Sequence, residues 1–212
     1  MKTLLIVSTL ALMTFVSPPS HATGAHAATE GPSKAVSTQM AVRDLWVDHI
    51  FWIRSVVVAK ADKNKKAETL ADQQVVENAK KIAGVIEPFY GKPASEKLFG
   101  LLAGHYGAVK DYMNATLPTP NTEKQKSATE KLTTNAIEIA TFLSGANPNL
   151  PKDTLVSLLA AHGGHHIAQI NEIQKKDFTA EAQTWADMKQ HMYTLSDALV
   201  GGIGKQFPEK FK

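Results

Sequence analysis

Apolar residues recur at helical spacing along most of the chain after about residue 38, and no segment alternates between apolar and polar residues as a half-buried strand does. Turns rich in glycine, proline and asparagine predict where each helix ends. The expected helices cover about residues 38–60, 68–87, 94–115, 121–144, 151–175 and 179–201. Because the connections are short, consecutive helices should be antiparallel. The sequence thus predicts an all-α fold, an up-and-down antiparallel helical bundle of four long helices with one or two additional packed helices.

The N-terminus differs from the rest of the chain, because a lysine is followed by an apolar run over residues 4–16 and then by small residues. This layout is typical of a secretory signal peptide, and the run is too short to span a bilayer. The small residues predict cleavage after Ala22 or Ala27, and hence a periplasmic or secreted protein. An uncleaved anchor in the membrane interface is the alternative. We expect a signal peptide and processing region, a disordered linker and a single helical-bundle domain, at residues 1–27, 28–37 and 38–212.

The composition narrows the function further. The net charge of +3 is spread along the chain in mixtures of Lys and Glu, without the dense basic stripe that binds phosphates, so nucleic acid is not an expected partner. Because the chain has no cysteine, any metal must be held by nitrogen and oxygen ligands. The sequence also lacks the phosphate-binding glycine loop, the dinucleotide fingerprint, the Gly-x-Ser-x-Gly elbow and the His-Glu-x-x-His motif, which disfavours ordinary hydrolases and nucleotide enzymes.

Four histidines lie in the middle of apolar stripes on three of the predicted helices. Since a helix turns by about 100° per residue, His49 and His105 point in the same direction as the apolar residues one turn before and after them. His162 and His166 are four residues apart, so they lie on one face in adjacent turns, where two imidazoles can share a metal ion. We therefore expect all four side chains to point into the core.

Other polar residues accompany the same stripes. His191 lies on the apolar face of the last helix with Asp187 one turn before it, and Glu138 borders the stripe of the fourth helix. Asn135 lies at the centre of that fourth stripe, whereas His165 is turned by about 80° from the neighbouring histidines of the fifth helix. We expect Asn135 and His165 to orient the ligands from a second layer.

So many inward polar groups need partners, because a buried polar group without a hydrogen bond costs about 1–3 kcal/mol or more. One or two divalent transition-metal ions would satisfy them together, and nitrogen-rich ligation suits Fe, Zn, Cu or Ni better than Mg or Ca. The alternative hypothesis is a metal-free structural or interaction bundle with a buried histidine polar network. The metal hypothesis names seven candidate ligands, which are His49, His105, His162, His166, His191, Asp187 and Glu138.

The pattern leaves open whether such a site binds or catalyses. An enzyme would use metal-activated water or dioxygen, whereas a binding protein would store, sense or deliver the metal. Gly163 and Gly164, next to His162, indicate a kink, a close helix approach or an opening in the fifth helix. A closed ligand set favours binding, and an open coordination position beside these glycines favours catalysis. Neither the substrate nor the oligomeric state follows from the sequence.

Short motifs spread over almost all of residues 38–212 match those of one protein family. They are Asp48-His49 with Trp52 and Arg54, Leu101-Leu102 with His105, Asn135-Ala136 with Ile139-Ala140, Phe142-Leu143-Ser144 with Asn147-Pro148, Leu158-Leu159 with His162, Gly202-Ile203, Gln206-Phe207-Pro208 and Lys210-Phe211. The chain thereby resembles an uncharacterised bacterial family of small helical proteins, many of which carry a glycosyltransferase label that no motif here supports. The resemblance implies the helical fold and no particular activity, and the leader implies an exported member.

A second resemblance rests on the inventory of inward-facing side chains. Five histidines, a glutamate and an aspartate are similar to the ligand set with which hemerythrin-like bundles hold two irons. The order differs, because Thr134 stands four residues before Glu138, where that family has a histidine, and Asp187 precedes His191 instead of following it. The resemblance implies a metal-binding bundle, while these departures count against bridging carboxylates and oxygen binding.

Overall fold

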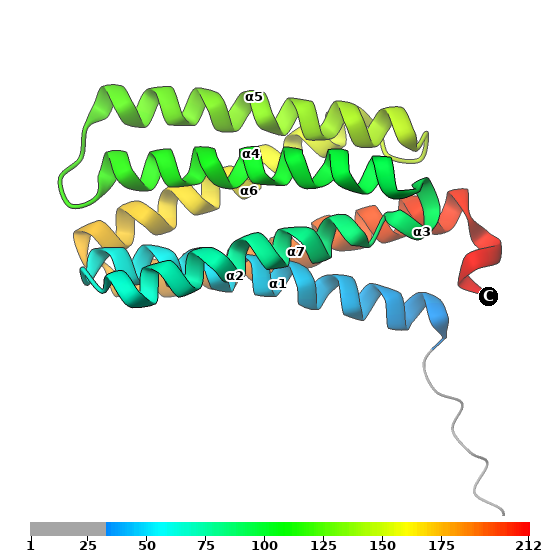
Figure 1. The fold of residues 1–212 in the computed structure, drawn as a ribbon, viewed down its shortest axis with the longest axis horizontal. Coiled ribbons are helices and arrows are strands. Elements are labelled where there is room, and N and C mark those ends of the chain that lie inside the picture. The colour runs from blue at the N-terminus through cyan, green and yellow to red at the C-terminus, as the bar shows by residue number, and fades with distance from the viewer. Residues whose placement is uncertain (1–32) are drawn as a thin grey trace, which may run out of the picture. The chain divides into compact units, whose positions relative to one another are not determined.

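The structure is a computed structural model that describes residues 33–212, and the secondary structure of this part of the chain consists of helices joined by short turns, without strands. The expected signal peptide and both cleavage points lie outside the described residues. None of the helices in this range combines the length and apolar character needed to cross a membrane. The elements (Figure 1) are α1 (Lys34–Ala61), α2 (Lys65–Gly84), the short α3 (Glu87–Tyr90), α4 (Lys92–Thr116), α5 (Thr122–Ala146), α6 (Lys152–Lys175), α7 (Phe178–Gln206) and a 3-10 helix η1 (Pro208–Phe211).

The six long helices pack as an antiparallel bundle in chain order. Each packs against the next long helix, α7 packs back against α1, and α6 also contacts α1 and α4 across the bundle. Their lengths range from 20 residues in α2 to 29 in α7, so each of the six is a long helix of the bundle. The predicted all-α, up-and-down antiparallel bundle is confirmed.

Side-chain caps fix the start of several helices. Ser33, Asn64, Asn121 and Asp177 each accept a hydrogen bond from a backbone N–H in the first turn of the helix that follows. Such a bond satisfies one of the N–H groups that have no partner within the helix. Because Ser33 caps α1, residues 34–37 are helical, although we expected them to belong to the linker.

Two helix ends differ from the expectation. α2 already stops at Gly84, whereas we expected it to continue to about residue 87, where the short α3 begins. α7 continues through its glycines to Gln206 instead of ending near residue 201. A Cβ at position 202 would lie 2.5 Å from Leu150 Cδ2, so any other residue there requires the Leu150 side chain to move. The glycine therefore lets α7 pack closely against Leu150, and it does not end the helix.

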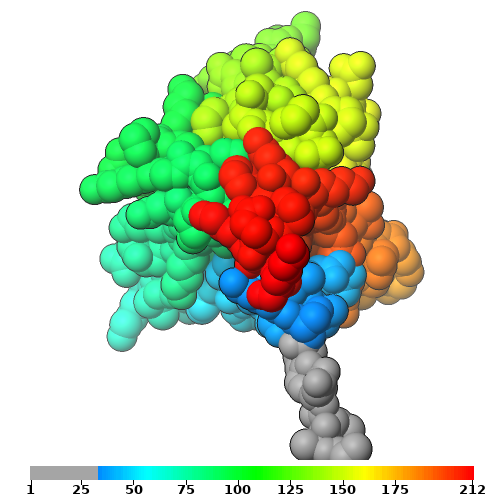
Figure 2. Space-filling view, turned by 90° about the vertical axis from the view of Figure 1, so that its right-hand side faces the viewer, coloured from blue at the N-terminus to red at the C-terminus, as the bar shows by residue number. Residues whose placement is uncertain are grey.

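The C-terminal residues cover one end of the bundle. Figure 2 views this end, with the last residues (red) lying across its middle beside the start of α1 (blue). The rings of Phe207 and Phe211 lie 5.5 and 5.6 Å from the ring of Phe89, measured between centroids. Aromatic contacts thus hold the C-terminus over the core.

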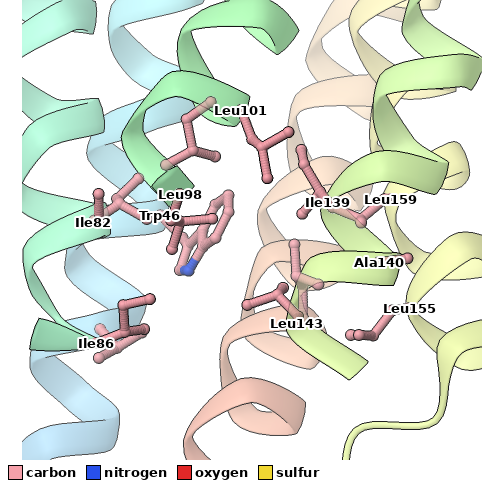
Figure 3. Close-up of a cluster of buried hydrophobic side chains, with 14 of the residues drawn as sticks. Trp46, Ile82, Ile86, Leu98, Leu101, Ile139, Ala140, Leu143, Leu155 and Leu159 are labelled. Atoms are coloured by element: carbon pink, nitrogen blue, oxygen red, sulfur yellow. The ribbon is translucent and has the colours of Figure 1, made fainter. Parts of the chain in front are cut away.

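The apolar core consists of two clusters that follow each other along the bundle. The first apolar cluster, which includes Trp46, Leu98 and Leu143, fills the half in which α1 begins and α7 ends (Figure 3). The second apolar cluster, which includes Ile53 and Ile170, fills the other half. Between them, the buried stripes of α1, α4 and α6 carry histidines in place of apolar residues.

Candidate metal centre

Four histidines from three helices meet between the two apolar clusters, and we call them the four-histidine cluster. His49 comes from α1, His105 from α4, and His162 and His166 from adjacent turns of α6. Their exposed fractions are 2%, 5%, 1% and 1%, respectively. The prediction that these four side chains point into the core is confirmed.

The four imidazoles are close enough to share one ion. Each contributes a ring nitrogen, and these atoms all lie within 4.8 Å of one another. His162 Nε2 and His166 Nε2 are only 3.2 Å apart. Nitrogens bound to one tetrahedral zinc ion at about 2.0–2.1 Å lie about 3.3 Å from each other. The α6 pair already has this spacing, and the remaining nitrogens need to approach by at most about 1.5 Å.

Most ring nitrogens of the cluster have no hydrogen-bond partner. They are both nitrogens of His49, Nε2 of His105, and Nδ1 of His162 and of His166. Leaving a buried polar atom unpaired costs about 1–3 kcal/mol, so this concentration of unpaired atoms is unusual for a folded protein. An ion bound by Nε2 of His162 and His166 would also give a partner to Nε2 of His105 and to one nitrogen of His49, whereas the two Nδ1 atoms of the α6 pair would stay unpaired.

Burial keeps these imidazoles neutral. It lowers the pKa of His49 to about 3, with a smaller contribution from the charge of His105, and it lowers the pKa of His105 to about 4. Burial, and secondly the neighbouring histidines, hold the pKa values of His162 and His166 well below 6.5. The neutral imidazole is the form that binds metals. At pH 7 the four rings can therefore bind an ion without first losing a proton.

Two buried amides reach from α5 and α2 to backbone carbonyls of α4 and α1, and that of Asn135 also acts on the cluster. Asn135 of α5 donates a hydrogen bond to the carbonyl oxygen of Leu101, and Asn78 of α2 donates one to that of Leu45, both at 3.0 Å. The side-chain oxygens of both asparagines are buried without a partner. The Asn135 side chain also opposes the lowering of the His105 pKa by burial, so it acts on that imidazole directly.

The structure does not bring the other predicted ligands into the cluster. Glu138 and Asp187 are exposed, and the half-buried His191 has its Nε2 2.8 Å from the carbonyl oxygen of Leu158. In the sequence, Glu138 bordered its apolar stripe and Asp187 was placed only by its spacing from His191. A modest difference in helix orientation turns such residues towards solvent or towards a neighbouring backbone.

His165, which also lies on α6, does not belong to the four-histidine cluster. Its half-buried ring lies 5.4 Å from that of His191, and burial and the His191 charge lower its pKa. Gly163 and Gly164 lie within the continuous helix, and a Cβ added at either would meet nothing within 4 Å. These glycines therefore do not mark a close approach of another helix.

An ion pair that the sequence patterns did not predict joins the partly exposed Arg54 to the buried Glu181. Arg54 binds Glu181 through two hydrogen bonds, from Nε to Oε1 at 2.6 Å and from Nη2 to Oε2 at 2.9 Å. Gln169 Nε2 donates to the same Oε1 at 2.9 Å, and its own side-chain oxygen is buried and unpaired. This arrangement lowers the pKa of Glu181, mainly through Arg54. Gln169 follows His166 by three residues and lies on the same face of the helix, so the helix phase also predicts that it points into the core.

The cluster offers four neutral nitrogen donors in an enclosed layer, and no carboxylate of residues 33–212 belongs to it. Such a set can hold one transition-metal ion. Comparisons with known proteins add no constraint, because no family model, no curated protein and no solved structure matches the chain. The resemblance based on short motifs stays a prediction, as does the hemerythrin-like one, although only four of the seven side chains behind the latter lie together.

Proposed function

We propose that this protein is exported and binds a single transition-metal ion through His49, His105, His162 and His166. The observation that carries the proposal is the convergence of four buried, neutral imidazoles, each with a ring nitrogen within 4.8 Å of those of the others, in a layer where five of the eight ring nitrogens have no hydrogen-bond partner. Structures in which this many polar atoms are buried together without hydrogen bonds are rare unless something binds there.

The donor set favours particular ions and a particular role. Imidazole nitrogen suits Zn, Cu, Fe and Ni, whereas Mg and Ca prefer oxygen ligands. Four protein ligands on one ion form a closed site, and closed sites are typical of binding rather than of catalysis. We therefore favour metal storage, sensing or delivery, and one ion per chain rather than two.

Export is supported by the sequence alone. The apolar run over residues 4–16 and the small residues before Ala22 and Ala27 have the layout of a cleavable signal peptide. Folding would then follow transport across the membrane, and the ion would be acquired in the periplasm or outside the cell.

The test is elemental analysis of the mature protein, purified without a histidine tag from cells supplied with the four metals. We expect about one equivalent of one metal, and its loss in a His162→Gln/His166→Gln variant. The matched control is His165→Gln/His191→Gln, which removes two histidines outside the cluster and should keep the metal. Saturating metal should also raise the free energy of unfolding, by about 2.7 kcal/mol at 100 times the dissociation constant.

A metal-free parent protein whose melting temperature responds neither to chelator nor to added metal would refute the proposal. That result would favour the second candidate, a metal-free bundle whose histidines form a polar network. One observation supports this candidate, namely that His162 Nε2 and His166 Nε2 lie 3.2 Å apart, at hydrogen-bond distance. In that case one ring donates and the other accepts.

A further inference from the structure

The first apolar cluster does not fill its own space completely. It leaves a partly enclosed cavity of about 50 Å³ to which all six long helices contribute walls. On this measure, a cavity needs about 10–15 Å³ to admit one water molecule. Well-packed cores have few voids larger than that, so a cavity of this size is a specific feature of the bundle. One wall residue from each helix illustrates the lining: Trp46, Ile82, Leu98, Leu143, Leu155 and Leu195.

The lining leaves water with too few partners. A buried water molecule needs about two to four hydrogen bonds. Only Trp46 and Tyr90 among the lining residues carry a polar side-chain group, and the Tyr90 hydroxyl already donates to Gln206 and accepts from Asn147, at 2.7 and 2.9 Å. Apolar cavities of this kind stay dry and bind small apolar molecules instead.

Trp46, which forms part of the cavity wall, also contacts the four-histidine cluster. Figure 3 shows the Trp46 indole pointing towards the middle of the first apolar cluster. The same ring meets His49 and His162 edge to face, at centroid distances of 5.6 and 6.3 Å. A molecule in the cavity would therefore touch a side chain that itself touches two of the imidazoles.

We propose that this cavity is a binding site for a small uncharged apolar molecule of a few heavy atoms, such as a diatomic gas or a short hydrocarbon. The volume excludes larger ligands such as acyl chains, and the absence of charged groups from the lining excludes ions. The site is separate from the metal ligands, so the proposal does not depend on metal binding.

The probe is xenon, which binds dry apolar cavities of comparable character. Mature metal-free protein is titrated with xenon in solution, and the ¹²⁹Xe chemical shift and the methyl signals of the protein are followed by NMR. We expect saturable binding, with the largest methyl shifts at lining residues such as Leu143 and Leu195, and a change in Trp46 fluorescence. In crystals under xenon pressure, density should appear beside Trp46.

A Val42→Ile/Ala146→Leu variant adds carbon atoms to the cavity wall and should lose saturable binding. The control, Val76→Ile, enlarges a side chain that is 37% exposed and is not part of the lining, so its binding should equal that of the parent. A linear xenon response that is the same in parent and filled variant would overturn the proposal. If the filled variant does not fold, pressurised crystals of the parent decide, and an empty or water-filled cavity there would also overturn it.

Discussion

Acidification of the metal-free protein should lower its free energy of unfolding well above the pH at which carboxylates titrate. The reason is that four imidazoles are buried in neutral form between the two apolar clusters. In the unfolded chain they accept protons as the pH falls below about 6.5. In the folded protein, burial lowers the pKa of His49 to about 3 and that of His105 to about 4, so both resist protonation. The unfolded state thus binds more protons, and the free energy of unfolding falls with the pH.

The magnitude follows from these two values. One pKa unit corresponds to about 1.36 kcal/mol. Between pH 6.5 and pH 4, His49 and His105 therefore each remove about 3 kcal/mol from the free energy of unfolding. Domains of this kind are stable by about 5–15 kcal/mol, so the combined loss of about 6 kcal/mol is a large share. His162 and His166, whose pKa values are also lowered, act in the same direction.

The assay is urea unfolding followed by circular dichroism at pH 7, 6, 5 and 4.5, on protein treated with chelator. A His49→Gln variant replaces one titrating imidazole with a side chain of similar polarity that does not titrate. Its stability should therefore fall less steeply than that of the parent as the pH is lowered. His191→Gln, outside the four-histidine cluster, is the control for the loss of any histidine. If the parent lost less than about 1 kcal/mol between pH 7 and pH 4.5, or if His49→Gln fell as steeply as the parent, the reasoning would be refuted.

Three further predictions concern stability at pH 7, each measured by urea unfolding. Gly163→Ala should stabilise by about 0.4–1 kcal/mol, because the new methyl group meets no atom within 4 Å and alanine favours the helix; a loss of stability would contradict this. Gly202→Ala should destabilise by about 1–3 kcal/mol, because its Cβ would lie 2.5 Å from Leu150 Cδ2, and unchanged stability would show that Leu150 moves freely. Arg54→Met should cost about 2–4 kcal/mol, because it leaves the buried Glu181 carboxylate without its charged partner. Arg54→Met/Glu181→Leu/Gln169→Met also removes the amide that donates to Glu181, so it should recover most of that loss, and failure to recover would show that the polar contacts themselves stabilise the fold.

The histidines that define the site could be found from the sequence because helix phase is a strong signal at the centre of a long apolar stripe. His49, His105, His162 and His166 all lie at such centres, and all four are buried. Their convergence from three helices could not be derived, because phase fixes the direction of a side chain and not its height relative to other helices.

The sequence was less informative at the edges of stripes and at the ends of helices. Glu138 bordered its stripe, and the structure turns it to solvent. The buried Glu181 was missed because a carboxylate in the first turn of a helix is ordinarily exposed, and its partner Arg54 is 127 residues away. At Gly202, the sequence suggested a helix end, whereas contact with Leu150 is the reason for the glycine. Each of these depends on tertiary contacts that local patterns do not contain.

The ligands come from α1, α4 and α6, which are every other member of the ring of six long helices. An ion held there would join helices that are not neighbours along the chain, and it would close two loops, between residues 49 and 105 and between residues 105 and 162. Cross-links across loops of this length restrict the unfolded chain strongly. Escape of the ion would require the three helices to separate, so the metal would act as a brace that slows unfolding and would leave only when the bundle opens.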